Sequence, residues 1–179
     1  AQNSKKSGTL ETCPTFFIRL QSLKYLELNP PTGVDMSRLT QKRIFVSGAQ
    51  GMVGSALARL LRTMESITLL TPSRDELDLA NQAQVERFFT NQRPEIVIFA
   101  AGKVGGIQAN RTFPADFLRD NLAIALHSID AAHRLGVERF LFLGSTCIYP
   151  RNAQQPIREN ALLTGPLEST NEAYALAKI

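Results

Sequence analysis

A short apolar run followed by three regularly spaced glycines constrains this chain more than any other feature. Residues 44–47 read Ile-Phe-Val-Ser, and glycines follow at positions 48, 51 and 54. An apolar run, a glycine turn and a helical apolar pattern predict a strand, a tight turn and a helix N-terminus. Gly48 would permit the sharp exit from the strand, Gly51 would let backbone approach a phosphate, and Gly54 would let the helix pack closely.

This turn predicts a binding site for the pyrophosphate of a dinucleotide, because unpaired amides at the positive end of a helix attract phosphate groups. The residues of the predicted site are Gly48, Ala49, Gln50, Gly51, Met52, Val53 and Gly54. The alternative for an isolated match of this kind is a glycine-rich turn that binds nothing.

The apolar pattern after residue 43 switches repeatedly between strand-like and helix-like segments, which is typical of βαβ units around a parallel sheet. Further strands are predicted at residues 67–70, 96–101 and 139–143. Helices are predicted after the glycine turn, after the capping residue Asn81, and from Pro114 to a stop at Gly136. We therefore predict an α/β fold: a Rossmann-type doubly wound parallel sheet with flanking helices.

Apolar residues at helical spacing predict the buried face of each helix. These residues are Val53, Ala56, Leu57, Leu60 and Leu61 on the first helix, Val85, Phe88 and Phe89 on the second, and Leu118, Leu122, Ala125, Leu126 and Ile129 on the third. Asn121 on the third helix is predicted to face water, as most asparagines do, with an inward hydrogen bond as the alternative.

Residues 1–38 differ from the rest of the chain, because Ser, Asn, Thr and Pro interrupt every apolar run and a Pro-Pro-Thr-Gly break occurs at 30–33. We expect them to form an extension outside the domain, which would occupy residues 39–179. The apolar stretch around Phe16 is too short for a membrane span and lacks the pattern of a signal peptide.

The chain carries 20 basic and 16 acidic residues, a net charge of +4, and the two signs alternate along the sequence. Without a basic stripe we expect no nucleic-acid partner, whereas a small phosphate-bearing molecule stays compatible. No membrane partner is expected either. Cys13 and Cys147 lie far apart, and His127 and His133 have no companion ligands, so no metal site is expected. A reducing cytoplasm is the expected location.

The segment after the second predicted strand bears on the identity of the dinucleotide, because this position meets the adenosine ribose. Arg74 stands there, and its planar guanidinium can pair with a ribose phosphate, which favours NADPH over NADH. The alternative is a solvated loop charge beside Asp75 and Glu76. Asp78 and Leu79 lie where the adenine would dock, with Asp78 accepting from the amino group and Leu79 packing on the ring.

Polar residues with catalytic potential follow the fourth predicted strand and occupy a further predicted helix at residues 171–178. In extended backbone, residues two apart share a face, so Ser145 and Cys147 would both point into a cleft at the carboxyl end of the sheet. Tyr174 and Lys178 are four apart in a helical sequence and would share one helix face. A nearby ammonium would lower the pKa of the Tyr174 phenol, which would make it a usable proton donor to a carbonyl.

The Ser, Tyr and Lys, in this order behind a glycine turn, resemble the extended short-chain dehydrogenase/reductase family, whose triad has these residue types. Longer motifs narrow the resemblance to the GDP-L-fucose synthases of that family. These motifs are Ala-Gly-Lys-Val-Gly-Gly-Ile at 101–107, Thr-Phe-Pro-Ala-Asp-Phe at 112–117, Gly-Ser-Thr-Cys-Ile-Tyr-Pro at 144–150 and Thr-Asn-Glu-Ala-Tyr-Ala-Leu-Ala-Lys at 170–178. The resemblance covers residues 43–179, which correspond to the N-terminal half of such an enzyme.

The resemblance implies an NADPH-dependent enzyme that epimerises GDP-4-keto-6-deoxy-D-mannose at carbons 3 and 5 and then reduces the keto group at carbon 4. Cys147 would be the base, Ser145 would hydrogen-bond the keto oxygen, Tyr174 would protonate it, and Lys178 would hold the nicotinamide ribose. The residues implied to line the nicotinamide half of the cofactor are Leu143, Gly144, Ser145 and Thr146, and those implied to border the sugar are Lys103, Val104, Gly105 and Gly106.

The chain departs from this family at Gln50, where relatives can carry an arginine that helps to bind the ribose phosphate, so NADPH preference rests on Arg74. The family's histidine acid and its C-terminal GDP-binding domain would lie beyond Ile179, and the parent enzyme would be a homodimer. We therefore expect the chain alone to be inactive. Three alternatives stay open: Cys147 is a buried structural thiol, the parent is another nucleotide-sugar epimerase, dehydratase or reductase, or the chain is a non-catalytic dinucleotide-binding protein.

Overall fold

The computed structural model describes residues 39–179; the predicted extension at 1–38, with Cys13, lies outside the described residues. Its central feature is a four-stranded parallel sheet in the order β2-β1-β3-β4. The strands are β1 (Arg43–Ser47), β2 (Thr68–Leu70), β3 (Ile96–Phe99) and β4 (Arg139–Phe142). The strand order reverses at β1, and ligands of open α/β folds bind at such a switch point.

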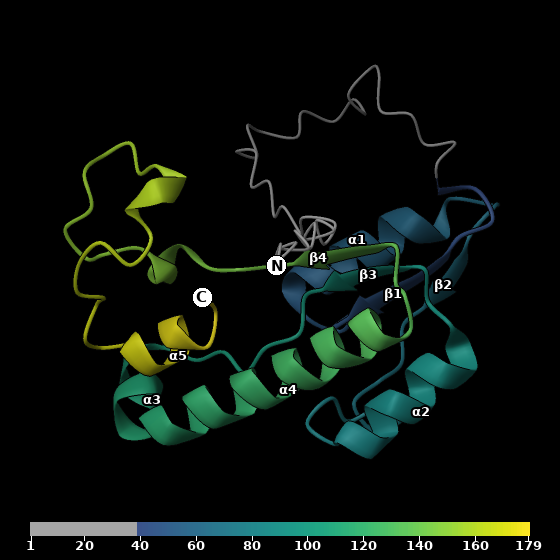
Figure 1. Ribbon diagram of the computed structural model, residues 1–179, viewed down its shortest axis with the longest axis horizontal. Coiled ribbons are helices and arrows are strands. Elements are labelled where there is room, and N and C mark those ends of the chain that lie inside the picture. The colour runs from purple at the N-terminus through teal and green to yellow at the C-terminus, as the bar shows by residue number, and fades with distance from the viewer. Residues whose placement is uncertain (1–38) are drawn as a thin grey trace, which may run out of the picture. The chain divides into compact units, whose positions relative to one another are not determined.

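Helices cover both faces of the sheet, with α1 (Met52–Arg62) on one face and α2 (Gln82–Gln92) and α4 (Pro114–Arg134) on the other (Figure 1). Shorter elements follow the carboxyl ends of β3 and β4. They are α3 (Ile107–Thr112), η2 (Thr146–Ile148), η3 (Glu159–Ala161) and α5 (Glu172–Leu176). The predicted fold class, a Rossmann-type doubly wound parallel sheet, is confirmed.

The core has two layers, one on each face of the sheet. Phe45, Val97 and Phe99 pack with Val85 and Phe89 of α2. On the opposite face the core residues are Ile44, Val46, Leu61 and Ile96. Strand β3 is thus covered on both sides, as its nearly continuous apolar run predicts. The predicted cap of α2 is also present, because the Asn81 side chain accepts from the Gln84 amide at 3.1 Å.

The predicted buried face of α1 was wrong at several positions. Gly54, Ala58 and Leu61 form the buried row, whereas Val53 is 47% exposed and Leu60 is 60% exposed. The cause is the contact between Gly54 and the glycine turn, because a Cβ at Gly54 would collide with the Gly48 carbonyl. This close approach rotates the small side of the helix toward the sheet, and the larger side chains turn outward.

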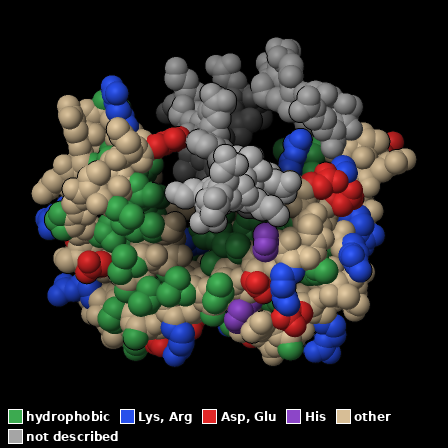
Figure 2. All heavy atoms as spheres, in the orientation of Figure 1, with side chains coloured by type: hydrophobic (Ala, Val, Ile, Leu, Met, Phe, Trp, Pro, Cys, Tyr) green, Lys and Arg blue, Asp and Glu red, His purple; other side chains and the backbone are tan. Residues whose placement is uncertain are grey.

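Helix α4 shows the same effect over a greater length. Its buried residues are Phe117, Asn121, Ala125, Ser128, Ala131 and Ala132. The predicted core residues Leu122, Leu126 and Ile129 are instead 46%, 64% and 46% exposed. Small side chains let α4 approach the sheet closely, so its leucines form an exposed apolar stripe. Apolar side chains also gather on the molecular surface over the region where Figure 1 places α3, α5 and the start of α4 (Figure 2).

Candidate dinucleotide and catalytic site

The glycine turn between β1 and α1 is shaped as a phosphate cradle. Gly48 has a φ of 68°, and a Cβ there would lie 2.9 Å from the Ala100 carbonyl carbon, so only glycine fits. The Gly51 amide donates to the Gly48 carbonyl at 2.9 Å and closes the turn. The first turn of α1 contains no acidic residue. Its positive end is therefore free to attract an anion.

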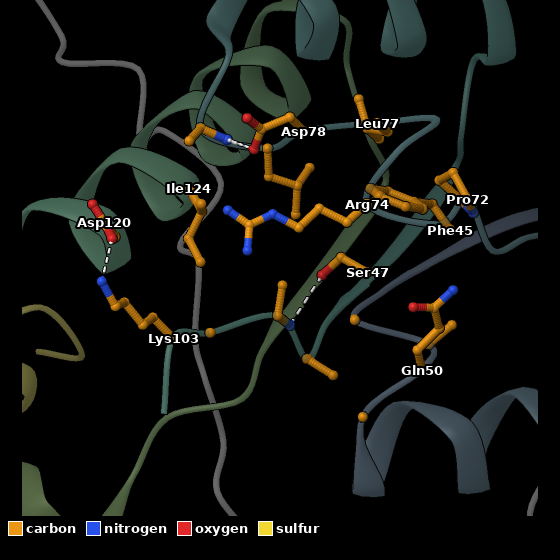
Figure 3. A pocket seen from close by; sticks show the side chains of 18 residues that line it. Phe45, Ser47, Gln50, Pro72, Arg74, Leu77, Asp78, Lys103, Asp120 and Ile124 are labelled. Carbon is orange, nitrogen blue, oxygen red and sulfur yellow. Dashed lines mark hydrogen bonds and ion pairs between the residues drawn. The ribbon is translucent and has the colours of Figure 1, made fainter. Parts of the chain in front are cut away.

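A cavity of about 450 Å³ opens beside this turn. It lies between the turn, the segment after β2, the segment after β3 and the side of α4 (Figure 3). The predicted cofactor residues that line it are Gly48, Ala49, Gln50, Gly51, Arg74, Asp78 and Leu79. The structure thus brings together the predicted pyrophosphate turn and the predicted adenosine segment in one cavity.

The remaining predicted cofactor residues lie outside this cavity. Met52 is 87% exposed on the first turn of α1, Val53 is exposed beside it, and Gly54 is buried under the turn. Residues 143–146 continue from β4, where the Leu143 amide donates to the Phe99 carbonyl at 3.0 Å. They stand at the carboxyl end of the sheet, next to the strand that leads into the cavity.

The Arg74 side chain extends into the middle of the cavity (Figure 3). The neighbouring carboxylate of Glu76 is engaged elsewhere, because it accepts from the Ser73 amide at 2.7 Å. This bond is the main cause of the lowered pKa of Glu76. Within residues 39–179, no ion pair involves Arg74. Its guanidinium is therefore available to an anionic ligand.

The turn that contains Asp78 and Leu79 is held from two helices. The Asp78 amide donates to the Gln84 side chain of α2 at 3.0 Å, and its carboxylate accepts from the Ala80 amide at 3.0 Å. His127 of α4 places Nδ1 3.2 Å from the Leu79 carbonyl oxygen. His127 thus packs α4 against this turn.

The loop after β3 contains the predicted sugar-binding residues, and asparagine side chains hold it. Asn121 is 1% exposed; its oxygen accepts from the Lys103 amide at 2.9 Å, and its nitrogen donates to the Lys103 carbonyl at 3.0 Å. The prediction that Asn121 faces water was wrong. Asn110 of α3 donates to the carbonyls of Gly105 and Gly106 at 2.9 and 3.1 Å. A signal for Asn121 exists in its helical row, because Phe117 and Ala125 lie four residues on either side.

The Lys103 side chain lines the cavity and pairs with Asp120 of α4 at 2.7 Å (Figure 3). Lys103, and then Arg119, lower the pKa of Asp120. Val104, the next residue, is 75% exposed. This loop therefore presents one paired cation to the cavity and an exposed apolar side chain next to it in the chain.

Ser145 is in extended backbone but Cys147 is not, so the expected sharing of a strand face was wrong. Residues 146–148 form the 3-10 turn η2, and Ser145 caps it by accepting from the Cys147 amide at 3.3 Å. Thr146 points into solvent. The turn follows because the capping hydroxyl competes with continuation of the strand for the backbone amide. It still brings the serine and the cysteine to the same place.

Tyr174 and Asn171 approach this turn from α5 and the residue before it. The Asn171 side-chain nitrogen donates to the Cys147 sulfur at 3.0 Å. Burial raises the pKa of Tyr174, the electrostatic influence of Cys147 raises it further, and a hydrogen bond with Ser145 opposes both. Ser145, Cys147 and Tyr174 are thus gathered from two segments. The expected lowering of the Tyr174 pKa was wrong, because burial, and then Cys147, disfavour the phenolate.

Lys178 is buried but is not adjacent to Tyr174 in the expected way. Helix α5 ends at Leu176, and the Lys178 amide donates to Ala175, three residues back, so the i, i+4 geometry does not extend to Lys178. Its Nζ donates to the Ala101 carbonyl at 3.4 Å. Within residues 39–179, no hydrogen bond joins Lys178 to Tyr174. Burial lowers the pKa of Lys178.

This chain matches one protein-family profile and is similar to several known proteins. The profile described as the NAD dependent epimerase/dehydratase family matches residues 44–179. The chain belongs to this family. Over 144 residues it is 55% identical to a GDP-L-fucose synthase of Sinorhizobium fredii, a match that covers 80% of this chain and 46% of the relative. The chain thus spans under half the length of the curated relatives it matches, and the predicted resemblance is confirmed.

Solved structures of this epimerase/dehydratase fold support the same assignment. A GDP-L-fucose synthetase of Naegleria fowleri bound to NADP has a TM-score of 0.71 and 30% identity, over 78% of this chain and 42% of that one. A GDP-mannoheptose C4 reductase from Campylobacter jejuni, MlghC, with NADP bound, has a TM-score of 0.73 and 35% identity, over 77% and 44%.

Residues 39–179 contain no group of three or more His, Cys, Asp or Glu side chains that could hold a metal ion. Among the same residues, no helix combines the length and the apolarity that a membrane crossing needs.

Proposed function

We propose that this chain is the cofactor-binding part of an enzyme that epimerises GDP-4-keto-6-deoxy-D-mannose at carbons 3 and 5 and reduces it at carbon 4 with NADPH. The observation that carries the proposal is the convergence of Cys147 with Ser145 and Tyr174 on η2 and α5. A reductase of this family needs the serine and the tyrosine, whereas the epimerisation also needs a base such as the thiol. The 55% identity with a GDP-L-fucose synthase supports the same assignment.

The residues of the cavity fit NADPH. The pyrophosphate would bind at the glycine turn, whose shape a Cβ at Gly48 would distort. The adenine ring would pack on the Leu79 side chain in the turn after β2. Arg74 extends into the cavity without an acidic partner among the described residues, which suits the ribose phosphate of NADPH. When bound, NADPH would supply the hydride for the reduction.

The catalytic roles follow from the protonation of each group. The Tyr174 phenol is protonated at neutral pH even at the ordinary pKa of tyrosine, so it has a proton to give to the oxygen of the ketone while Ser145 donates a hydrogen bond to that oxygen. Cys147, as a thiolate, would accept the proton from the carbon beside the ketone, and the Asn171 amide would stabilise that thiolate. Lys178 would bind the nicotinamide ribose, and the loop from Lys103 to Gly106 would border the sugar.

The parent enzyme is proposed to be a homodimer. The exposed stripe of Leu122, Leu126 and Ile129 on α4 supports this, since contiguous apolar side chains on a helix face are typical of protein interfaces. A GDP-sugar is the proposed small-molecule partner, and the proposed domain of this chain is residues 39–179.

The test is a chimera in which residues 39–179 replace the matching part of the Sinorhizobium fredii relative. Cys147→Ser should stop solvent deuterium from entering carbons 3 and 5 but leave slow reduction of the unepimerised ketone. Tyr174→Phe should keep the deuterium exchange while NADPH consumption collapses. The two signals separate proton transfer from hydride transfer.

A second candidate is a carbon-4 reductase without epimerase activity, which the similarity to the Campylobacter jejuni C4 reductase favours. The same chimera distinguishes the two. If the unmodified chimera consumes NADPH while no deuterium enters carbons 3 and 5, the reductase alone is the better assignment. If Cys147→Ser leaves the exchange at the rate of the unmodified chimera, the thiol only packs and another group is the base.

A further inference from the structure

Lys178 lies over two stacked phenylalanine rings at the carboxyl end of the sheet. Its Nζ is 4.9 Å from the ring centroid of Phe142 and 5.9 Å from that of Phe99. The two rings are the last residues of β3 and β4 and are paired in register. Their centroids are 5.2 Å apart and their planes differ by 8°. The lysine thus faces a preformed aromatic surface rather than a flexible side chain.

This lysine has few other sources of stabilisation. It is 7% exposed, and the Ala101 carbonyl at 3.4 Å is the hydrogen-bond acceptor that the structure gives its Nζ. Gly102 leaves room for the ammonium, because a Cβ there would lie 3.3 Å from Nζ. Within residues 39–179, no carboxylate lies within 4.0 Å of it. A buried ammonium without a carboxylate needs compensation, and an aromatic π face can provide it.

The other titratable groups on the surrounding elements do not supply this compensation. Among the described residues, no hydrogen bond joins the Lys178 ammonium to Tyr174 on α5 or to Cys147 on η2, and burial lowers the pKa of Lys178. Asp120 on α4 is engaged with Lys103 at 2.7 Å. Phe99 and Phe142 are therefore the groups left to stabilise the cation.

We propose that Phe99 and Phe142 are positioning residues that form a cation–π seat for Lys178, keeping it charged and holding its Nζ beside the turn after β3. The role of this seat in cofactor binding rests on the function proposed above, in which Lys178 holds the nicotinamide ribose. The cation–π contact itself does not depend on that function. The two claims can therefore be tested separately.

The direct test measures the pKa of Lys178 in the 179-residue chain by NMR titration with lysine labelled with 13C at Cε, assigned by Lys178→Arg. Phe142→Leu should lower the pKa of Lys178 by about half a unit or more, the size expected for a partly shielded cation–π contact. Phe140→Leu is the matched control. Phe140 lies on β4, as Phe142 does, and stacks on Phe99 of β3 with ring centroids 5.9 Å apart. Phe140 makes no cation–π contact with Lys178.

A fluorinated series at position 142 guards against changes in packing. Substitution with mono-, di- and trifluorophenylalanine withdraws charge from the ring face with little change in shape, so the Lys178 pKa should fall stepwise. The proposal is overturned if the pKa stays constant across this series, or if fluorination at position 140 lowers it equally. If Phe142→Leu fails to fold, the fluorinated series still tests the proposal, because it keeps the shape of the ring.

The functional consequence is tested by NADPH affinity in the same proteins. Phe142→Leu should weaken NADPH binding severalfold, while Phe140→Leu changes it little. A fall in the Lys178 pKa without any change in affinity would establish the seat and overturn its link to the cofactor. Failure of every variant, including the unmodified chain, to bind NADPH would count against the proposed function instead, because the pKa measurement needs no cofactor.

Discussion

The side-chain nitrogen of Asn171 donates a hydrogen bond to the sulfur of Cys147 across 3.0 Å. Asn171 immediately precedes α5 and Cys147 lies in η2, so the bond joins two segments that are separated by the long loop after η2. An amide donor favours a thiolate over a neutral thiol, because hydrogen bonds to an ionised acceptor are stronger. The reactivity of Cys147 should therefore depend on Asn171.

We predict that Asn171→Ala slows alkylation of Cys147 by iodoacetamide at pH 7 on the order of tenfold, the effect of losing one hydrogen bond to a charged group. The measurement is mass spectrometry of the peptide that contains Cys147, which separates it from Cys13. Asn152→Ala, an exposed asparagine elsewhere, is the control. A faster reaction in Asn171→Ala would mean that the amide shields the sulfur instead of activating it.

Arg74→Ala should weaken NADPH binding by about 1.5–3 kcal/mol, the usual contribution of a hydrogen bond to a charged group, and leave NADH binding nearly unchanged. The reason is that Arg74 extends into the cavity and has no acidic partner in the described part of the chain. Dissociation constants for both cofactors at fixed salt check this. Arg93→Ala, beyond the end of α2, is the matched control. Equal weakening of both cofactors would rule out pairing with the ribose phosphate.

Gly54→Ala should destabilise the fold by about 1–3 kcal/mol or more, because the added Cβ would collide with the Gly48 carbonyl and the turn would have to move. The midpoint of urea unfolding, with an unchanged slope, measures this. Gly144→Ala is the control, since a Cβ at Gly144 has nothing within 4 Å. A Gly54→Ala protein of unchanged stability would show that the contact between α1 and the turn is easily relaxed.

The raised pKa of Tyr174 predicts a loss of stability in alkaline solution. Burial and Cys147 favour the neutral phenol in the folded state. The stability that the neutral phenol contributes is therefore fully present below 10.0, the pKa of tyrosine in the unfolded chain, and is lost as the pH rises through the pKa of the folded state. Between about pH 8 and pH 11, the free energy of unfolding measured with urea should fall more steeply for the unmodified chain than for Tyr174→Phe. Tyr149→Phe is the control. Parallel curves for Tyr174→Phe and the unmodified chain would contradict the assigned cause.

The sequence predicted the architecture well because the signals of the sheet are local. The strand, glycine turn and helix around Gly48 and the cap at Asn81 each depend on residues close together in the chain. The faces of α1 and α4 could not be predicted by counting apolar residues. Which face packs depends on how closely the helix approaches the sheet, and Gly54 and Ala125 decide that.

The structure brings several of the predicted site residues together, but the sequence did not predict their geometry. Ser145 and Cys147 do lie together, but through a capped turn instead of a strand. The surroundings of Tyr174 and Lys178 depend on where α5 ends and on the rings of β3 and β4, which are distant in sequence. Asn121 was misjudged because its partner, the backbone of Lys103, lies in another segment.

Helix α4 contacts two loops that line the cavity through side chains six residues apart: Asn121 holds the loop after β3, and His127 contacts the turn after β2 at Leu79. An α-helix rises 1.5 Å per residue, so this interval corresponds to about 9 Å along a rigid rod. The helix therefore fixes the distance between the two loops. An insertion or deletion within this interval would change the length of ligand that the cavity accepts, even though neither loop had been altered.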